Sequence, residues 1–259
     1  MAIPCDPSIP WDDIAPEVIS HIDPWDTPTL FACSLTHTSW RLPAQRRLYH
    51  TVEIRSREDI RRWYEFDAKE KFTHYVRHLV YSGDEGNPLG PRDLSEMFGE
   101  QFLGFKEIHT LEIRHLTLGW FDLDLFRLAF GHLRKTLRAL LIRDATVTLN
   151  KLLELLTLFP RLHCLGLDRF TVVREPFQIL GELPFFRGTL NLSGPVDGYG
   201  LRFIEDLTRM LPNFPSVRLR LNLSYHATRH LLKIPSFPNH ITTMLLGYQD
   251  GKPDSLSSK

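Results

Sequence analysis

Two histidines of this sequence have a spacing that suits metal ligands. His226 and His230 lie four residues apart, so on a helix their imidazole rings would share one face, as zinc ligands do. No carboxylate, cysteine or third histidine stands near them in the sequence. We therefore expect a surface or capping pair here, and no metal site.

Motifs that build a catalytic centre are missing. The chain contains neither a G-x-S-x-G nucleophile elbow nor the glycine-rich patterns that cradle nucleotide phosphates. Acid pairs such as Asp12 and Asp13, or Asp122 and Asp124, stand where helices would begin, and a favourable interaction with the helix dipole explains them. The sequence predicts a protein that is not an enzyme and needs no cofactor. A hydrolase or transferase would require a deep pocket with converging titratable groups.

A second group of polar residues follows apolar residues in the sequence at a regular distance. These residue types suit the binding of a protein better than catalysis. Ion pairs and hydrogen bonds from such side chains recognise protein partners, although side chains that are only solvated would show the same pattern. The residues predicted to face a protein partner are Glu112, Arg114, Arg143, Asp168, Asn191, Arg220 and Asn222.

The apolar residues behind this pattern repeat along most of the chain. Each unit has an apolar residue, two spacers, a second apolar residue, one spacer and a third apolar residue, as in Ile108 to Ile113. The second apolar position falls at Val52, Leu79, Leu111, Leu140, Leu165, Leu190, Leu219 and Met244, in steps of 25 to 32 residues. Leucine-rich repeats run about 20–29 residues, so this repeat is irregular. The register at Leu219 could slip by two, since Leu223 continues the alternation.

Helix-like segments fill the intervals between these expected strands, at residues 91–98, 121–133, 149–159 and 200–211. In the second of them, helical spacing joins Leu125, Leu128, Ala129 and His132 on one face. The alternation of strand and helix predicts an α/β fold, with a leucine-rich-repeat-like solenoid over residues 51–247. A compact α/β domain with a parallel sheet is the alternative, but the fixed three-then-two spacing favours the solenoid.

In such a solenoid, the residues that follow the second and third apolar positions point away from the core. Stacked strands would align them in two columns on the concave face. Arg114 and Arg143 would then be neighbours, with Glu112 close to both. The result is a mixed polar surface that suits protein recognition.

Residues 9–50 do not follow the repeat, and their pattern predicts three short helices. The expected ranges are 11–22, 28–35 and 39–49, and Pro24 and Pro28 break the chain between the first two. Helices this short cannot bury all their apolar faces among themselves. The remaining apolar surface predicts a partner.

The motifs of this module resemble a known family. Ile14-Ala-Pro-Glu-Val-Ile-Ser-His-Ile22 resembles the opening of an F-box, and Ala32-Cys-Ser-Leu-Thr-His-Thr-Ser-Trp40 with Arg46-Arg-Leu-Tyr-His-Thr-Val52 resembles its second half. Ala15 and Thr36 stand where the F-box pattern has proline and valine. In fungal proteins this F-box type commonly continues into degenerate leucine-rich repeats, so the whole chain resembles a fungal F-box-like protein.

The resemblance implies an intracellular adaptor. F-box helices pack against the Skp-type adaptor subunit of a cullin-RING ubiquitin ligase complex, while the repeats hold the substrate. Carried over by position, the docking residues would be Pro16, Glu17, Val18, Ile19, Ile22, Leu30, Cys33, Leu35 and Trp40. Some of these would instead be internal core, Trp40 and Ile22 first. The alternative function is a leucine-rich-repeat scaffold with no ligase link, whose residues 1–50 cap the solenoid and leave no apolar patch.

Composition sets the remaining expectations. The 259 residues are 42% hydrophobic and carry 31 Lys and Arg against 31 Asp and Glu, a balance that predicts neither nucleic-acid nor membrane binding. Three separated cysteines and an N-terminus without an apolar signal region predict an intracellular protein, cytoplasmic or nuclear. Residues 248–259, rich in Ser, Asp and Pro, are expected to form a disordered tail.

Overall fold

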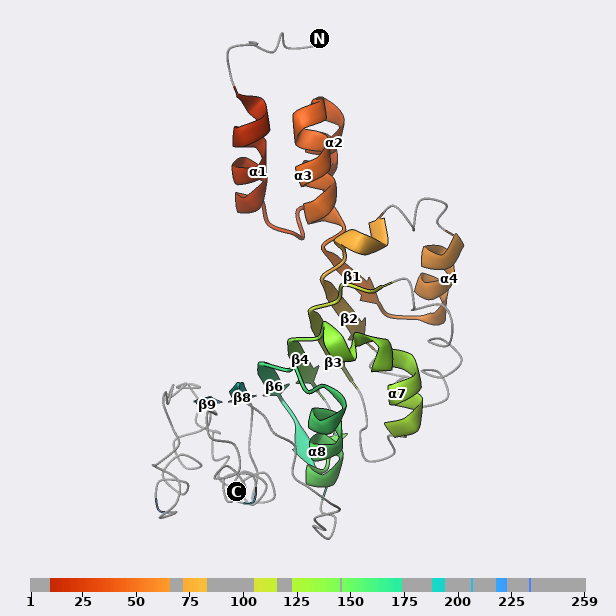
Figure 1. Cartoon of the computed structure of the whole chain (residues 1–259), viewed down its shortest axis with the longest axis vertical. Coiled ribbons are helices and arrows are strands. Elements are labelled where there is room, and N and C mark those ends of the chain that lie inside the picture. Colours follow the sequence, from red (N-terminus) through yellow and green to blue (C-terminus); the bar gives the residue numbers. More distant parts are fainter. Residues whose placement is uncertain are drawn as a thin grey trace, which may run out of the picture.

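Three helices precede an alternation of strands and helices (Figure 1). The computed structural model describes residues 10–65, 72–82, 105–115, 123–144, 146–173, 188–193 and 218–222, together with Asp206 and Lys233. The N-terminal helices are α1 (Trp11–His21), α2 (Thr27–Thr36) and α3 (Thr38–Leu48). The protein therefore has an α/β fold with a three-helix group ahead of the sheet, and the predicted helix ranges are confirmed to within one residue.

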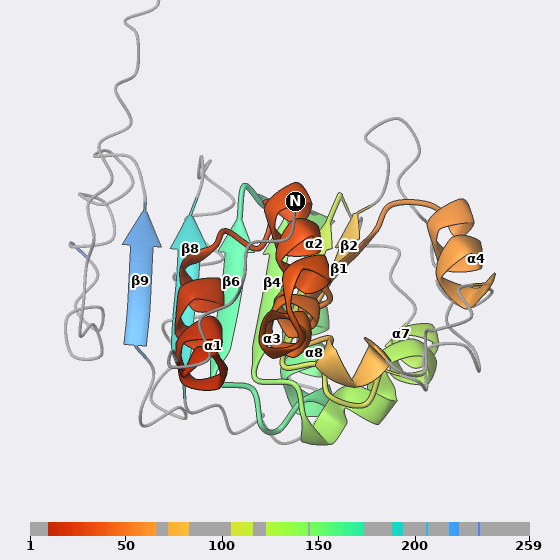
Figure 2. The same cartoon turned by 90° about the horizontal axis from the view of Figure 1, so that it is seen from above.

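The main sheet is parallel throughout. Its strands, in order, are β1 (Thr51–Ile54), β2 (His78–Ser82), β3 (Thr110–Arg114), β4 (Ala139–Arg143), β6 (Cys164–Asp168), β8 (Thr189–Ser193) and β9 (Arg218–Asn222). Each strand pairs in parallel with the one before it, so the chain adds strands in one direction, and Figure 2 shows the arrows of β6, β8 and β9 pointing the same way. Two short strands, β5 (Thr146–Val147) and β7 (Thr171–Val172), form a separate parallel pair.

The predicted repeat positions lie side by side across the main sheet. Direct pairing links Val52, Leu79, Leu111, Leu140, Leu165, Leu190 and Leu219. The register predicted from apolar spacing is confirmed for these strands. Because Leu219 pairs with Leu190, the strand does not slip by two residues. The predicted strand around Met244 lies outside the described residues.

The helices between strands lie on one side of the sheet in Figure 1. They are α4 (Arg57–Glu65), α7 (Leu123–Phe130) and α8 (Leu149–Leu158). The range predicted for α8 is confirmed to within one residue, whereas α4 was not predicted. The core contains alternate strand residues, such as Leu140 and Ile142, together with Leu152 and Leu155 of α8. The predicted helices at 91–98 and 200–211 (apart from Asp206) and the tail lie outside the described residues.

The predicted apolar face of residues 121–133 was wrong. Leu128 is 65% exposed, while Phe126 and Phe130 are buried, and their rings lie 4.6 Å apart between centroids. The Phe126 ring also meets Phe159 edge-on, with centroids 6.0 Å apart, so the aromatic side of α7 faces the core. The α-helix ends at Phe130 and continues as the tighter turn η4 (Gly131–Lys135).

Three successive units end in the same backbone turn. His115, Asp144 and Arg169 directly follow β3, β4 and β6, and all have positive φ angles, of 55°, 50° and 49°. The N–H of each donates to the carbonyl of the last residue of the next strand, at 2.9 to 3.0 Å. The units thus repeat in backbone conformation as well as in apolar spacing.

Candidate protein-binding surfaces

Local sequence signals place the N-terminal helices. Asp26 caps α2, since its Oδ1 accepts a hydrogen bond from the N–H of Thr29 at 3.2 Å. Pro28 stands in the first turn of α2, where a missing N–H costs no helical hydrogen bond. His37 caps α3, and its Nδ1 accepts from the N–H of Ser39 at 3.2 Å. These caps orient α2 and α3 as a hairpin, and α3 also packs against α1.

A small core holds the three helices together. Ile19, Leu30 and Ala44 are buried at its centre, one from each helix. Four partly buried side chains pack around them: Ile22, Cys33, Trp40 and Leu48. Ile22 and Trp40 are therefore core residues, as expected for part of the docking set. Ile19 and Leu30 were also predicted to dock a partner, but their side chains are buried in the core of the three helices, so this part of the prediction was wrong.

The outer surface of the same helices also carries exposed apolar side chains. Of the predicted docking residues, Pro16, Glu17, Val18 and Leu35 are exposed, and Leu35 has 67% of its surface accessible. Val18 lies on α1 and Leu35 on α2. The predicted apolar remainder of the module is therefore present in the described residues.

Other exposed apolar residues of these helices were missed by the motif comparison. They are Ile14, Trp25, Phe31 and Leu42. Ile14 and Phe31 stand four residues before Val18 and Leu35, so each pair lies on one face of its helix. This spacing was the signal that could have identified them. We call Ile14, Val18, Phe31 and Leu35 the apolar surface of α1 and α2.

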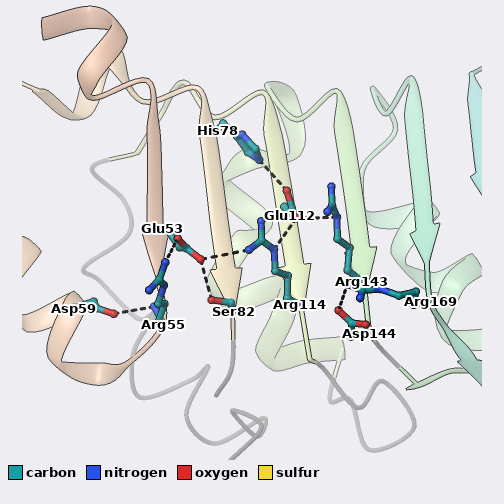
Figure 3. A network of polar contacts seen from close by, with 10 residues as sticks. All are labelled: Glu53, Arg55, Asp59, His78, Ser82, Glu112, Arg114, Arg143, Asp144 and Arg169. Atoms are coloured by element: carbon teal, nitrogen blue, oxygen red, sulfur yellow. Dashed lines mark hydrogen bonds and ion pairs between the residues drawn. The ribbon is translucent and has the colours of Figure 1, made fainter. Parts of the chain in front are cut away.

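A network of charged side chains covers the face of the sheet that points away from the core (Figure 3). Glu112 lies at its centre on β3. Its Oε1 accepts a hydrogen bond from Nε of Arg114 at 2.7 Å and forms an ion pair with Arg143, whose Nε lies 2.9 Å away. Its Oε2 lies 3.5 Å from Nε2 of His78. Arg114 and Arg143 are paired across β3 and β4, so the predicted grouping of these residues around Glu112 is confirmed.

Glu112 itself does not face solvent, and the prediction that it faces a substrate was wrong. It is 3% exposed, because the side chains bound to it come from three adjacent strands. Burial alone would raise its pKa, but contacts with His78 and Arg114 and the charge of Arg143 outweigh burial and lower the pKa from 4.5 to about 2. Glu112 is thus a structural anion that holds two partly exposed arginines side by side.

The network continues to the edge strand β1. Oε1 of Glu53 lies 3.5 Å from Nη1 of Arg114 and accepts from Oγ of Ser82 at 3.3 Å. Its Oε2 lies 2.7 Å from Nη2 of Arg55, and this hydrogen bond lowers the pKa of Glu53 against the effect of burial. The linked charges therefore join β1, β2 and β3 into one ordered polar strip.

An open pocket of about 190 Å³ lies on the same face over β4, β6 and β8. Its polar lining consists of Arg143, Asp168, Asn191 and Ser193. Ser193 donates a hydrogen bond to Asp168, and Oδ1 of Asn191 is buried without a partner among the described residues. Three of the predicted substrate-facing residues thus share one pocket, which can accept a side chain with hydrogen-bonding groups.

The last two predicted substrate-facing residues lie on β9. Arg220 pairs with Asn191, and Asn222 pairs with Ser193, so both continue the predicted columns. The columns themselves are confirmed by strand pairing from β2 to β9.

The surfaces of the described residues suit the binding of a protein. Within the described ranges, no three His, Cys, Asp or Glu side chains are placed to hold a metal ion, and His226 and His230 lie outside those ranges. No helix among the described segments is long and apolar enough to cross a membrane. What these segments present is an apolar surface on α1 and α2, paired charges on the sheet, and a small polar pocket.

Comparisons with known proteins do not assign the chain to a family. No protein-family model matches the chain, and a search of curated proteins finds no match. The functional argument therefore rests on the surfaces described above.

Proposed function

We propose that this protein is the substrate-recognition adaptor of an F-box (Skp-cullin type) ubiquitin ligase. In this proposal α1 and α2 dock the Skp-type subunit, the strands belong to an irregular leucine-rich-repeat solenoid, and the polar face of the sheet binds a protein substrate. The observation that carries the proposal is the apolar surface of α1 and α2. It remains exposed although the three helices have a core of their own.

The energetics of that surface support a partner. Burying one large aliphatic or aromatic side chain stabilises by about 1.5–3 kcal/mol, and four such residues stay exposed here. Val18 lies in the stretch that resembles the opening of the F-box, and Leu35 in the stretch that resembles its second half. A docking partner would bury both, together with their neighbours Ile14 and Phe31.

The alternative, a repeat scaffold with no ligase link, predicts that the same apolar residues are buried. If the helices served only to cap the repeats, their apolar side chains would be covered by the first strands. Leu35 and Phe31 are instead exposed by 67% and 55%. The exposure therefore favours the adaptor over a simple cap.

The repeat part of the proposal rests on two independent regularities. The apolar positions pair in register from β1 to β9, and His115, Asp144 and Arg169 repeat one turn geometry. Sequential strand order with helices on one side is the arrangement expected when each unit buries its apolar face against its neighbours.

Co-purification with a Skp-type adaptor subunit tests the proposal. We expect the native chain to bind it and Leu35→Asp to bind at least about tenfold more weakly, because a carboxylate would have to be desolvated in the contact. Leu128→Asp is the matched control, since Leu128 is 65% exposed but lies on α7.

Circular dichroism of the native chain and both variants shows whether each protein is folded, so that a loss of binding is not confused with unfolding. With folding intact, absence of binding by the native chain would reject the ligase role. Equal binding by the native chain and Leu35→Asp would reject the proposed docking surface.

A further inference from the structure

Histidine and arginine residues form a row along the edge of the sheet where the strands begin, which for β6 in Figure 2 is the end opposite its arrowhead. The residue before the strand is histidine or arginine at β1, β2, β3, β4 and β6: His50, Arg77, His109, Arg138 and His163. Backbone hydrogen bonds keep them in register, because the carbonyl of each accepts from the N–H of the next, at 2.7 to 2.9 Å. Residues far apart in the sequence thus become immediate neighbours.

Additional cations flank this row. Exposed ones are Lys106, Arg134, Lys135 and Arg161. Nη1 of Arg161 donates to the carbonyl of Lys135 at 3.2 Å, which brings the units of β4 and β6 together. Glu107, 3.8 Å from Arg77, is the one acidic residue among the described residues of this edge. In a chain with 31 basic and 31 acidic residues, positive charge is therefore segregated here.

The histidines of the row respond to this charge. Burial and the charges of Arg77 and Arg138 lower the pKa of His109. Burial and the charge of Arg47, followed by those of His78 and Arg77, lower the pKa of His50. Both shifts favour the neutral imidazoles, so the positive charge of this edge comes from its arginines and lysines.

We infer that this basic edge, defined by Arg77, Lys106, Arg134, Lys135, Arg138 and Arg161, binds an acidic segment of a partner protein. Neighbouring strands are about 4.8 Å apart, so the row from β1 to β6 spans about 19 Å. An extended peptide covers about 3.3 Å per residue, and about six residues would match that length. The segment would run across the strand starts and leave the polar face of the sheet accessible.

Aromatic residues at this edge favour a peptide over a nucleic acid. Tyr49 stacks on Phe72 with centroids 4.1 Å apart, Phe72 lies against Tyr75, and Arg46 lies over the Tyr75 ring. Proteins that bind single strands present aromatic faces on which bases stack. Here the described aromatic rings contact one another, so charge complementarity is the main attraction that this edge offers.

The test uses a fluorescent octaglutamate peptide and the full chain, with binding followed by anisotropy at low salt. We expect the double variant Lys135→Glu, Arg138→Glu to bind at least about tenfold more weakly than the native chain. The control variant Arg62→Glu, Arg127→Glu has the same net charge change on α4 and α7, and we expect its affinity to stay within about twofold of native. An octaglutamine peptide should not bind.

Three outcomes would overturn the inference: no binding by the native chain, equal losses in both double variants, or preferential binding of a single-stranded oligonucleotide that octaglutamate cannot displace. Thermal unfolding followed by circular dichroism confirms that each variant is folded. The inference does not depend on the ligase proposal, since it concerns another part of the molecule and its experiment contains no Skp-type subunit.

Discussion

Glu112 shows how far a residue's environment can depart from what its strand position indicates. Strand alternation correctly places it on the face away from the core, beside Arg114 and Arg143. Its burial depends on His78 and Arg143, which belong to the preceding and following strands. The predicted register indicates which residues are neighbours on adjacent strands. It does not indicate how closely their side chains pack, and this packing is what buries Glu112.

The buried charge of Glu112 predicts a specific dependence of stability on pH. Its pKa in the folded protein is lowered from 4.5 to about 2, so its stabilising contribution is complete above pH 4.5 and is lost as the pH falls toward 2. A shift of this size corresponds to about 3 kcal/mol. We therefore expect Glu112→Gln to lower the free energy of unfolding by about this amount at pH 7 and to have little effect near pH 2.

Urea unfolding across this pH range measures the difference between native protein and variant. Glu58→Gln is the control, because Glu58 is an exposed partner of Arg62 and its removal should change stability by less than about 0.5 kcal/mol. A Glu112→Gln penalty that stays constant from pH 7 to pH 2 would contradict the assigned role of the charge.

At the level of elements, the start of β8 depends on a glycine. Gly188 occupies the position that is basic or histidine in the preceding units, and a Cβ there would lie 2.2 Å from the carbonyl oxygen of His163. Backbone would have to move, because the obstructing atoms belong to the neighbouring strand start. We expect Gly188→Ala to lower the free energy of unfolding by about 1–3 kcal/mol.

Gly131→Ala provides the comparison for this prediction. A Cβ at Gly131 would meet Cγ of Arg127 at 3.6 Å, an ordinary contact, so its effect should stay within about 0.5 kcal/mol. Denaturant unfolding of the two variants measures both effects. Equal stabilities would show that β6 and β8 are not held as closely as the structure describes.

The elements that the sequence predicted well are those with one dominant apolar period. Three-then-two spacing identified the strands and their register, and Pro24 and Pro28 marked the break between the first two N-terminal helices. The face of α7 was predicted wrongly because two faces of the segment are apolar, one with Leu128 and one with Phe126 and Phe130. Only packing in the folded core, where Phe126 meets Phe159, selects the aromatic one.

At the scale of the whole molecule, a neutral charge balance concealed an uneven distribution. The sequence contains equal numbers of basic and acidic residues, so its net charge is zero. The parallel register nevertheless brings the residues that precede each strand together at one edge of the sheet. A signal was available, since His50, Arg77, His109, Arg138 and His163 all stand two residues before the repeat marker. The docking set, by contrast, was only partly predictable, because Ile19 and Leu30 share the motif but form the core.

The proposed functions occupy separate parts of the chain: α1 and α2 for the adaptor subunit, and the polar face and basic edge for protein ligands. Hydrogen–deuterium exchange on the native chain, with and without a Skp-type adaptor subunit, tests this division most directly. We predict slower exchange in α1 and α2 and unchanged exchange in β3, β4 and β6 when the subunit is added. No change in α1 and α2, or protection confined to the strands, would contradict the central claim that these helices form the docking surface.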